Sequence, residues 1–134
     1  MKKPSYVVDS YALMAYLGDE VGAEQVKTLL RQAQGDDAII YLSLINLGEV
    51  AYIIERRYGS ERLQEVLAIL AQLPINPIEA SFELVLAAAH VKAQHAVSYA
   101  DTFAIALAQE KGAPVVTGDP EFKKVEHLVQ VVWL

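Results

Sequence analysis

Residues 5–17 read SYVVDSYALMAYL, and the spacing of their apolar side chains changes at Asp9. Before Asp9 the chain is a short apolar, β-branched run, which is typical of a strand. After Asp9 the apolar side chains recur at helical spacing. The stretch therefore predicts a strand over 5–9 that passes directly into a helix over 10–19.

The same change of period repeats along the chain. Further strands are expected at 38–43, 75–78, 113–118 and 128–134, and further helices at 23–35, 44–59, 60–73, 79–95 and 98–112. Strands that are apolar throughout and alternate with helices are typical of a parallel sheet covered on both faces. The sequence thus predicts the α/β class, as a single-domain three-layer α/β/α sandwich over residues 1–134 with a mostly parallel central sheet.

Two local details are also predicted. Ser60 is expected to cap the helix over 60–73. In the helix over 79–95, the inward face is expected to consist of Phe82, Val85, Leu86 and Ala89.

Composition narrows the class of protein. The chain has 134 residues, 54% of them hydrophobic, which suits one domain with its own core. It has no cysteine, which excludes disulfides, thiolate metal sites and a cysteine nucleophile and favours a reducing compartment. The N-terminus begins like a signal peptide, but Asp9 interrupts the apolar stretch and no cleavage motif follows. With no apolar run long enough to span a membrane, a soluble cytoplasmic protein is expected.

The net charge of −6 argues against a non-specific DNA-coating protein, because phosphate contacts need a basic surface. It leaves room for a nuclease whose negative charge is gathered in a metal site.

Four acidic residues stand where they can meet. Asp9 closes the first strand and Asp119 follows the strand over 113–118. Both are therefore expected at the carboxyl edge of the sheet, where α/β folds bind ligands. Glu49 lies in an otherwise apolar helical stretch, and Asp101 lies in the first turn of its helix.

Each acid also suits an ordinary structural role. Asp9 and Asp119 are favourable N-caps, and Asp101 is spaced from Ser98 as in a capping box. A glutamate among apolar neighbours must be paired or neutral, and Arg56 or Arg62 is a candidate partner for Glu49. These alternatives stay open at the level of sequence.

Four carboxylates in one cleft repel one another unless a cation joins them. Mg²⁺ or Mn²⁺ prefers carboxylate and water oxygens, and the chain offers no thiolate for a softer metal. Such an ion generates hydroxide near neutral pH, orients a phosphodiester and stabilises a leaving oxygen. The four acids thus predict a metal-dependent hydrolytic site.

The stretches YVVDSYALMAYL, SLINLGEV, SYADTFAIALA and PVVTGDPEF resemble, in order and spacing, the four acidic blocks of PIN-domain ribonucleases. The closest resemblance is to the VapC toxins of toxin–antitoxin pairs, and it covers essentially the whole chain. It implies a Mg²⁺- or Mn²⁺-dependent endoribonuclease that acts on RNA and is blocked by an antitoxin. An RNA-processing nuclease without an antitoxin and a non-catalytic metal-binding module are the alternatives.

Carried onto this chain, the resemblance assigns catalytic and metal-binding roles to Asp9, Glu49, Asp101 and Asp119, with Ser10, Asn46 and Thr117 in support. The last block varies within the family, so the resemblance leaves open whether Glu121 shares or takes the role assigned to Asp119. Asp9 and Asp101 are expected as the main ligands, Glu49 as the group that holds water and acts as general base, and Asp119 as the group that positions a second ion or the water. Whether one ion or two bind is left open.

Other residues are given no site role. The three histidines are expected at helix edges or the surface, and the tyrosines in the core, except Tyr99 beside the acids. The pairs Arg56–Arg57 and Lys123–Lys124 suit RNA phosphates and solvated helix ends equally. The apolar excess of residues 51–73 predicts an interface, which we assign to a homodimer and to a groove for the antitoxin. A basic side chain of the antitoxin, best an arginine, is expected to reach the carboxylates.

Overall fold

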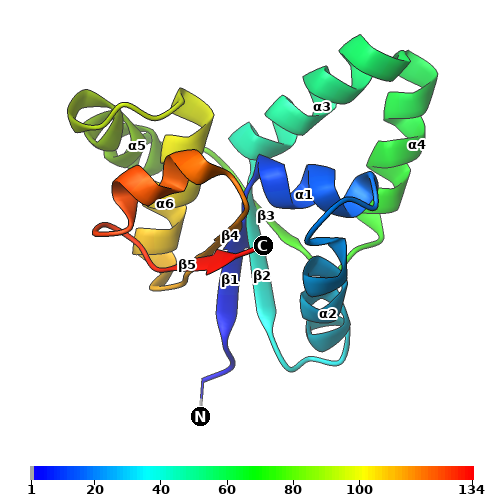
Figure 1. Cartoon of the computed structure of the whole chain (residues 1–134), viewed down its shortest axis with the longest axis horizontal. Helices are drawn as coiled ribbons and strands as arrows, with labels where there is room; N and C mark the ends of the chain where they lie inside the picture. Colours follow the sequence, from blue (N-terminus) through cyan, green and yellow to red (C-terminus); the bar gives the residue numbers. More distant parts are fainter. Residues whose placement is uncertain (1) are drawn as a thin grey trace.

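The computed structural model describes residues 2–134, so Met1, with which the expected domain begins, lies outside the described residues. In chain order the elements are β1 (Ser5–Val8), α1 (Ser10–Leu17), α2 (Ala23–Gln34), β2 (Ile39–Ser43), α3 (Leu44–Tyr58), α4 (Ser60–Ala71), β3 (Asn76–Ile78), α5 (Phe82–Gln94), α6 (Tyr99–Lys111), β4 (Val115–Thr117), the 3-10 helix η1 (Pro120–Val125) and β5 (Val131–Trp133). Figure 1 shows their arrangement.

The five strands form one sheet in the order β3-β2-β1-β4-β5, and every neighbouring pair is parallel. The strand β1 is central and pairs with β2 on one side and β4 on the other. Helices α5 and α6 lie on one face of the sheet, and α1 and α2 lie on the other (Figure 1). The predicted α/β/α sandwich is confirmed, and its sheet is wholly parallel.

Two hydrophobic clusters hold the layers together, and adjacent residues of the central strands belong to opposite clusters. Val7 and Val115 pack with α5, α6 and η1, whereas Val8 and Val116 pack with α1 to α4. This alternation follows from the side-chain period of a strand. Because both faces are covered, the central strands carry no polar alternation, which is why their apolar runs predicted the fold.

Helix α6 is the most deeply buried helix of the described chain. The run Asp101–Ala108 is buried residue by residue, with small alanines between larger side chains. Small side chains allow α6 to sit between α5 and the sheet. A carboxylate in the first turn of such a helix is consequently held at the edge of the core.

Two local predictions were wrong. Ser60 is the first residue of α4, and the cap position is Gly59, with no side-chain hydrogen bond. Helix α5 begins later than expected, because the Ser81 hydroxyl accepts a hydrogen bond from Leu84 N at 3.1 Å and caps it there.

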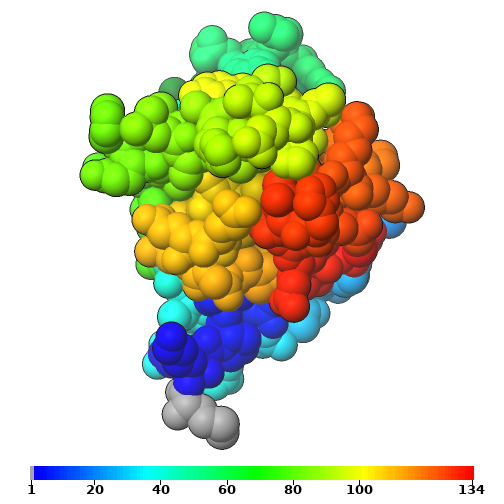
Figure 2. All heavy atoms as spheres, turned by 90° about the vertical axis from the view of Figure 1, so that its left-hand side faces the viewer, coloured from blue at the N-terminus to red at the C-terminus, as the bar shows by residue number. Residues whose placement is uncertain are grey.

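The expected inward face of α5 was wrong for three of its four residues, since only Val85 packs against the core. Leu84, Ala88 and Val91 are buried, whereas Phe82 is 75% and Leu86 is 53% exposed. Ala89 is exposed and Val85 is half-buried. Helix α5 is apolar on most sides, so the periodicity of its sequence does not show which side is buried. Packing against α6 determines the buried side instead. Figure 2 shows α5, in yellow-green, as an outer ridge of the molecule.

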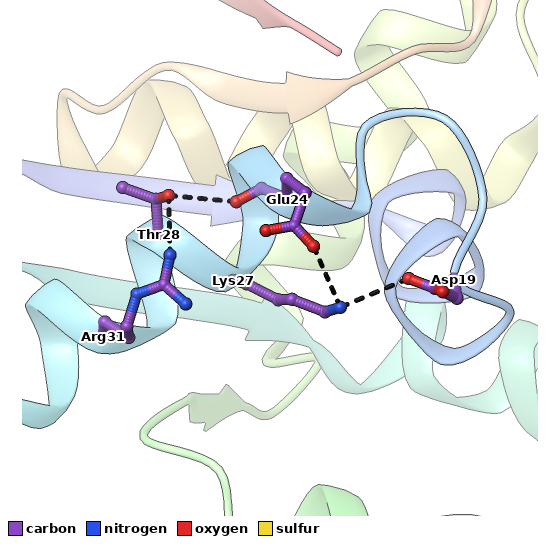
Figure 3. Close-up of polar contacts among 5 residues, drawn as sticks. All are labelled: Asp19, Glu24, Lys27, Thr28 and Arg31. Carbon is purple, nitrogen blue, oxygen red and sulfur yellow. Dashed lines mark hydrogen bonds and ion pairs between the residues drawn. The ribbon is translucent and has the colours of Figure 1, made fainter.

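The loop between α1 and α2 is tied to α2 by exposed polar contacts. Lys27 Nζ lies 3.2 Å from Asp19 Oδ1 and 3.1 Å from Glu24 Oε1, and Thr28 Oγ1 donates to Glu24 O at 3.0 Å (Figure 3). Exposed pairs of this kind contribute little stability. The contact from Lys27 to Asp19 links the loop to α2, and Glu20, which follows Asp19, lines the pocket described below.

Within residues 2–134, no helix combines the length and apolar character needed to cross a membrane.

The orientation of α5 predicts different outcomes for two leucines that lie two residues apart, on opposite sides of the helix. Leu84→Ala should lower the free energy of unfolding by about 2–5 kcal/mol, because it leaves a cavity in the core. Leu86→Ala should change it by less than about 0.5 kcal/mol, because its side chain is exposed. Urea unfolding at low protein concentration measures both. Equal losses would contradict the assigned face.

Candidate active site

The carboxyl ends of the central strands open into a pocket of about 490 Å³. Its lining comes from five separate segments of the chain: Asp9, Ser10, Tyr11, Met14, Ala15, Glu20, Glu49, Ile53, Arg57, Ser98, Asp101, Asp119 and Glu121. The four acids singled out in the sequence all line it, and Glu20 and Glu121 add two more carboxylates. A parallel sheet produces this convergence, because all its strands end at the same edge.

Asp9 is the most buried acid of the pocket, at 1% exposure. It follows β1 and caps α1, with Oδ1 accepting a hydrogen bond from Ala12 N at 2.8 Å. Burial raises the pKa of Asp9 to about 7, and the nearby charges of Asp101 and Asp119 add to this, while hydrogen bonds from Thr117 and Ala12 lower it. The ionised form is thus costly in the fold.

Asp101 lies in the first turn of α6 and is 7% exposed. The Ser98 hydroxyl caps α6 by accepting from Asp101 N at 3.2 Å. Burial raises the pKa of Asp101 to about 6, helped by the charges of Asp119, Glu49 and Glu121, while a hydrogen bond from Ser98 lowers it. The capping pattern is present, and the carboxylate still lines the pocket.

Asp119 is both an N-cap and a pocket residue. Its Oδ1 accepts from Glu121 N at 3.0 Å at the start of η1, and its own N–H donates to Thr117 Oγ1 at 3.0 Å. Thr117 is fully buried, and its hydroxyl also hydrogen-bonds the Asp9 carboxylate. The same hydroxyl thus contacts the Asp9 side chain and the Asp119 backbone. Glu121 is exposed and pairs with Lys124 at 2.7 Å.

Asn46 does not line the pocket but fastens the elements beneath it. Its Nδ2 donates to Ser10 Oγ at 3.2 Å and to Ala100 O at 3.1 Å, and Ser10 Oγ donates back to Asn46 O at 3.3 Å. These bonds join α1, α3 and α6 at a point that is fully buried. Asn46 Oδ1 is buried without a partner within the described residues.

Glu49 is half-buried on α3 and lines the pocket. The two arginines proposed as its partners are engaged elsewhere, Arg62 with Glu65 at 2.8 Å and Arg56 over the ring of Tyr52 at 5.3 Å. Among residues 2–134, Glu49 makes no ion pair, so the ion-pair explanation for this residue was wrong.

Several lining residues were not expected from the sequence. Arg57 is the only basic residue of the described chain that lines the pocket, and its neighbour Arg56 does not line it. Tyr11 lines it, whereas Tyr99 does not and instead packs edge-on against Phe103, with ring centroids 5.1 Å apart. The helical position of Arg57, two turns beyond Glu49, is the one signal that could have identified it. None of the histidines lines the pocket.

The donor set fits a hard divalent ion in its chemistry. The six carboxylates at the pocket offer oxygen ligands, and the buried carboxylates Asp9 and Asp101 have no ion pair within residues 2–134. In the same residues, no three acidic or histidine side chains stand close enough together to form a ready-made ligand set. Mutual repulsion of carboxylates favours such spacing when no cation lies between them.

Comparison with known proteins identifies the family. The model of the PIN domain matches residues 6–128. The chain belongs to the PIN-domain family. Ribonuclease VapC of Mycolicibacterium smegmatis is 30% identical to this PIN domain over 124 residues, which cover 87% of this chain and 93% of the relative. The resemblance to PIN-domain ribonucleases is thereby confirmed.

Solved structures agree on the fold. The VapC20 toxin of Mycobacterium tuberculosis, which is described as cleaving the sarcin–ricin loop, is 18% identical with a TM-score of 0.71, over 90% of this chain and 94% of that chain. VapBC2 of Rickettsia felis, bound to a DNA fragment from its promoter, is 16% identical with a TM-score of 0.76, over 96% of this chain and 97% of that chain. At these identities the likeness concerns the PIN fold alone.

The raised pKa of Asp9 predicts a pH-dependent stability. Its charged form is disfavoured in the fold, so the penalty is complete above about pH 7 and shrinks as the pH falls toward the ordinary value of 3.8. Asp9→Asn keeps an acceptor for Ala12 N and removes the charge. In EDTA it should exceed wild type in unfolding free energy by about 2–4 kcal/mol at pH 8, and the gain should shrink at pH 5.

Urea unfolding of both proteins across this pH range is the measurement. Asp37→Asn, at an exposed position outside the pocket, is the matched control and should show no such gain. A difference between Asp9→Asn and wild type that stays constant with pH would contradict burial as the cause.

Proposed function

We propose that this PIN-domain protein is a Mg²⁺- or Mn²⁺-dependent endoribonuclease, the toxin of a toxin–antitoxin pair, and that it acts in the cytoplasm as a single nuclease domain over residues 1–134. The observation that carries the proposal is that the buried carboxylates Asp9 and Asp101, from separate segments, line one pocket and make no ion pair within residues 2–134. The 30% identity to a protein named Ribonuclease VapC supports the choice of RNA as substrate.

Asp9 and Asp101 are the residues that would hold the ion, with Asp119 or Glu121 completing the set. A bound divalent ion supplies charge stabilisation for the phosphate and lowers the pKa of water. Thr117, Ser98 and the N–H of Ala12 hold the carboxylates in place by the hydrogen bonds described above. The partnerless Asn46 Oδ1 adds a buried oxygen close to this network.

Glu49 has the position of a general base. It is half-buried, lines the pocket and has no ion pair within the described chain, so its carboxylate is free to accept a proton from an attacking water. The water oxygen forms the new bond to phosphorus as the bond to the leaving oxygen breaks. Arg57 lies two turns after Glu49 on the same helix, and we propose that its guanidinium donates a hydrogen bond to a phosphate oxygen of the RNA.

Carboxylate variants test the proposal directly. Asp101→Asn should lower Mn²⁺-dependent RNA cleavage at least about 100-fold, by analogy with the loss of other electrostatic stabilisers. It should also lose the rise in melting temperature that Mn²⁺ gives wild type, because that rise follows RT ln(1 + [L]/Kd). Asp37→Asn serves as the control. Cleavage near the wild-type rate in Asp101→Asn would refute the assignment.

The fourth acid is resolved by the same two measurements on Asp119→Asn and Glu121→Gln. Asparagine caps a helix about as well as aspartate, so a purely capping Asp119 predicts a silent change. We expect Asp119→Asn to lose both cleavage and the Mn²⁺ shift. If Glu121→Gln loses them instead, Glu121 is the fourth acid.

The antitoxin is proposed to lie in a groove between α1, α3 and α4, where apolar side chains alternate with the charged side chains of Glu20, Arg57 and Arg62. This groove of about 250 Å³ includes Leu17, Ile54, Tyr58, Val66 and Ile69, and it shares Met14, Glu20 and Arg57 with the acidic pocket. An apolar segment in the groove would bring a neighbouring basic side chain to the carboxylates.

A homodimer is proposed through the outer face of α5 rather than through residues 51–73. Most large apolar side chains of that stretch are buried or half-buried, and only Ile54, Leu63 and Val66 are fully buried, whereas Tyr52, Tyr58 and Ile69 are exposed. Phe82 and Leu86 are exposed on neighbouring turns of α5, which is the arrangement of an apolar contact face.

Two glutamate substitutions separate these surfaces. Ile69→Glu places a charge in the groove and should weaken antitoxin binding at least about tenfold while the dimer persists. Leu86→Glu should give a monomer in light scattering while antitoxin binding persists. Each variant is the control for the other, with the product of the adjacent small reading frame as the antitoxin. A variant that leaves its own partner unaffected would refute that surface.

A further inference from the structure

Tyr11 is an aromatic side chain placed at the acidic pocket rather than in the core. It lies directly after Asp9 and Ser10, lines the pocket with them, and is 41% exposed. The other tyrosine near the acids, Tyr99, is engaged edge-on with Phe103. Tyr11 therefore offers ring surface beside the carboxylates of Asp9 and Asp119.

The ring is supported from behind by Gly118. A Cβ built on Gly118 would lie 2.4 Å from Tyr11 Cε1 and 2.9 Å from Tyr11 Cζ, closer than atoms tolerate. Gly118 is not among the glycines with positive φ, so its backbone does not require glycine. A larger residue at this position would instead have to displace the ring, which lies against the backbone at Gly118. The Tyr11 ring therefore packs against the segment Thr117–Asp119, which belongs to the fourth acidic block.

The charge of the pocket limits how RNA can be held. Six carboxylates line it and one guanidinium, that of Arg57, opposes them within the described residues. Protein cations therefore contribute little binding energy to a phosphodiester in this pocket, whether or not a divalent ion is bound. Stacking of a base on an aromatic ring does not depend on this charge and is a general means of holding single strands.

We infer that Tyr11 is a stacking platform for one unpaired nucleobase next to the scissile phosphate. This rests on the proposed ribonuclease function. The pocket volume of about 490 Å³ lies within the range of roughly 300–1,000 Å³ typical of small-molecule sites, which leaves room for a splayed nucleotide.

The geometry favours RNA over the antitoxin as the partner of this ring. Tyr11 lines the acidic pocket but not the groove between α1, α3 and α4. A base bound against it would leave its phosphate beside Asp9 and Asp119, which is where the proposed reaction occurs.

The test uses a short labelled single-stranded RNA that contains every dinucleotide step, cleaved by wild type in Mn²⁺. Tyr11→Leu should raise KM roughly tenfold with kcat little changed, because a ground-state contact is lost. Tyr11→Phe keeps the ring and should behave as wild type. Tyr52→Leu, a change at an equally exposed tyrosine outside the pocket, is the matched control.

Two double-mutant cycles distinguish stacking from general damage. Replacing the base next to the cleaved bond by an abasic nucleotide should cost wild type about as much as Tyr11→Leu does, and the two changes together should cost no more. Gly118→Ala should raise KM in wild type by displacing the ring, and should add little in Tyr11→Leu, where the smaller side chain leaves space.

The outcomes separate this inference from the proposed function. If wild type cleaves RNA and the two changes in either cycle are simply additive, the platform is refuted and the ribonuclease stands. If Tyr11→Leu loses antitoxin affinity but keeps its KM for RNA, the ring belongs to the protein interface and the inference is overturned. If wild type cleaves no RNA, the proposed function and the inference fall together.

Discussion

The structure depends on keeping the Asp9 carboxylate at the buried end of the central strand. That position is 1% exposed, and burial, together with the charges of Asp101 and Asp119, raises the pKa of Asp9 to about 7. Two contacts oppose this cost, the Ala12 N–H at the start of α1 and the hydroxyl of Thr117 at the end of β4. Both exist only because α1 starts directly after β1 and β4 is its sheet neighbour. The order of the strands and helices therefore supplies the hydrogen bonds that the buried Asp9 carboxylate needs.

Capping and site formation turn out to be compatible uses of the same side chains. Asp9 and Asp119 each accept a backbone N–H with Oδ1, which leaves the second carboxylate oxygen of each free of that bond. Ser98 caps α6 and contacts the Asp101 carboxylate as well. Because the positive end of a helix lies at its N-terminus, a carboxylate there is stabilised while it faces the sheet edge. The sequence could not decide between cap and ligand, because the fold allows both.

The sequence predicted the fold because its signal is physical and local. Strands buried on both faces must be apolar throughout, and acids that directly follow such strands must reach the carboxyl edge. The face of α5 escaped prediction because α5 is apolar on most sides, so only packing against α6 settles that Ala88 points inward and Phe82 outward. Tyr11 and Arg57 escaped for a related reason. Nothing in the sequence says that a ring after Ser10 will meet a glycine more than a hundred residues later, or which of two adjacent arginines faces the pocket.

The unbalanced negative charge of the pocket links the proposed activity to the proposed inhibition. Asp9, Asp101 and Glu49 have no ion pair within residues 2–134, and the groove between α1, α3 and α4 opens onto them through Met14, Glu20 and Arg57. A divalent ion would neutralise these carboxylates, and so would a cationic side chain of a partner bound in the groove. Both cannot do so fully at once, because each neutralises the same charge. Partner binding should therefore compete with metal, so an excess of Mn²⁺ should weaken the partner most when its basic side chain is intact.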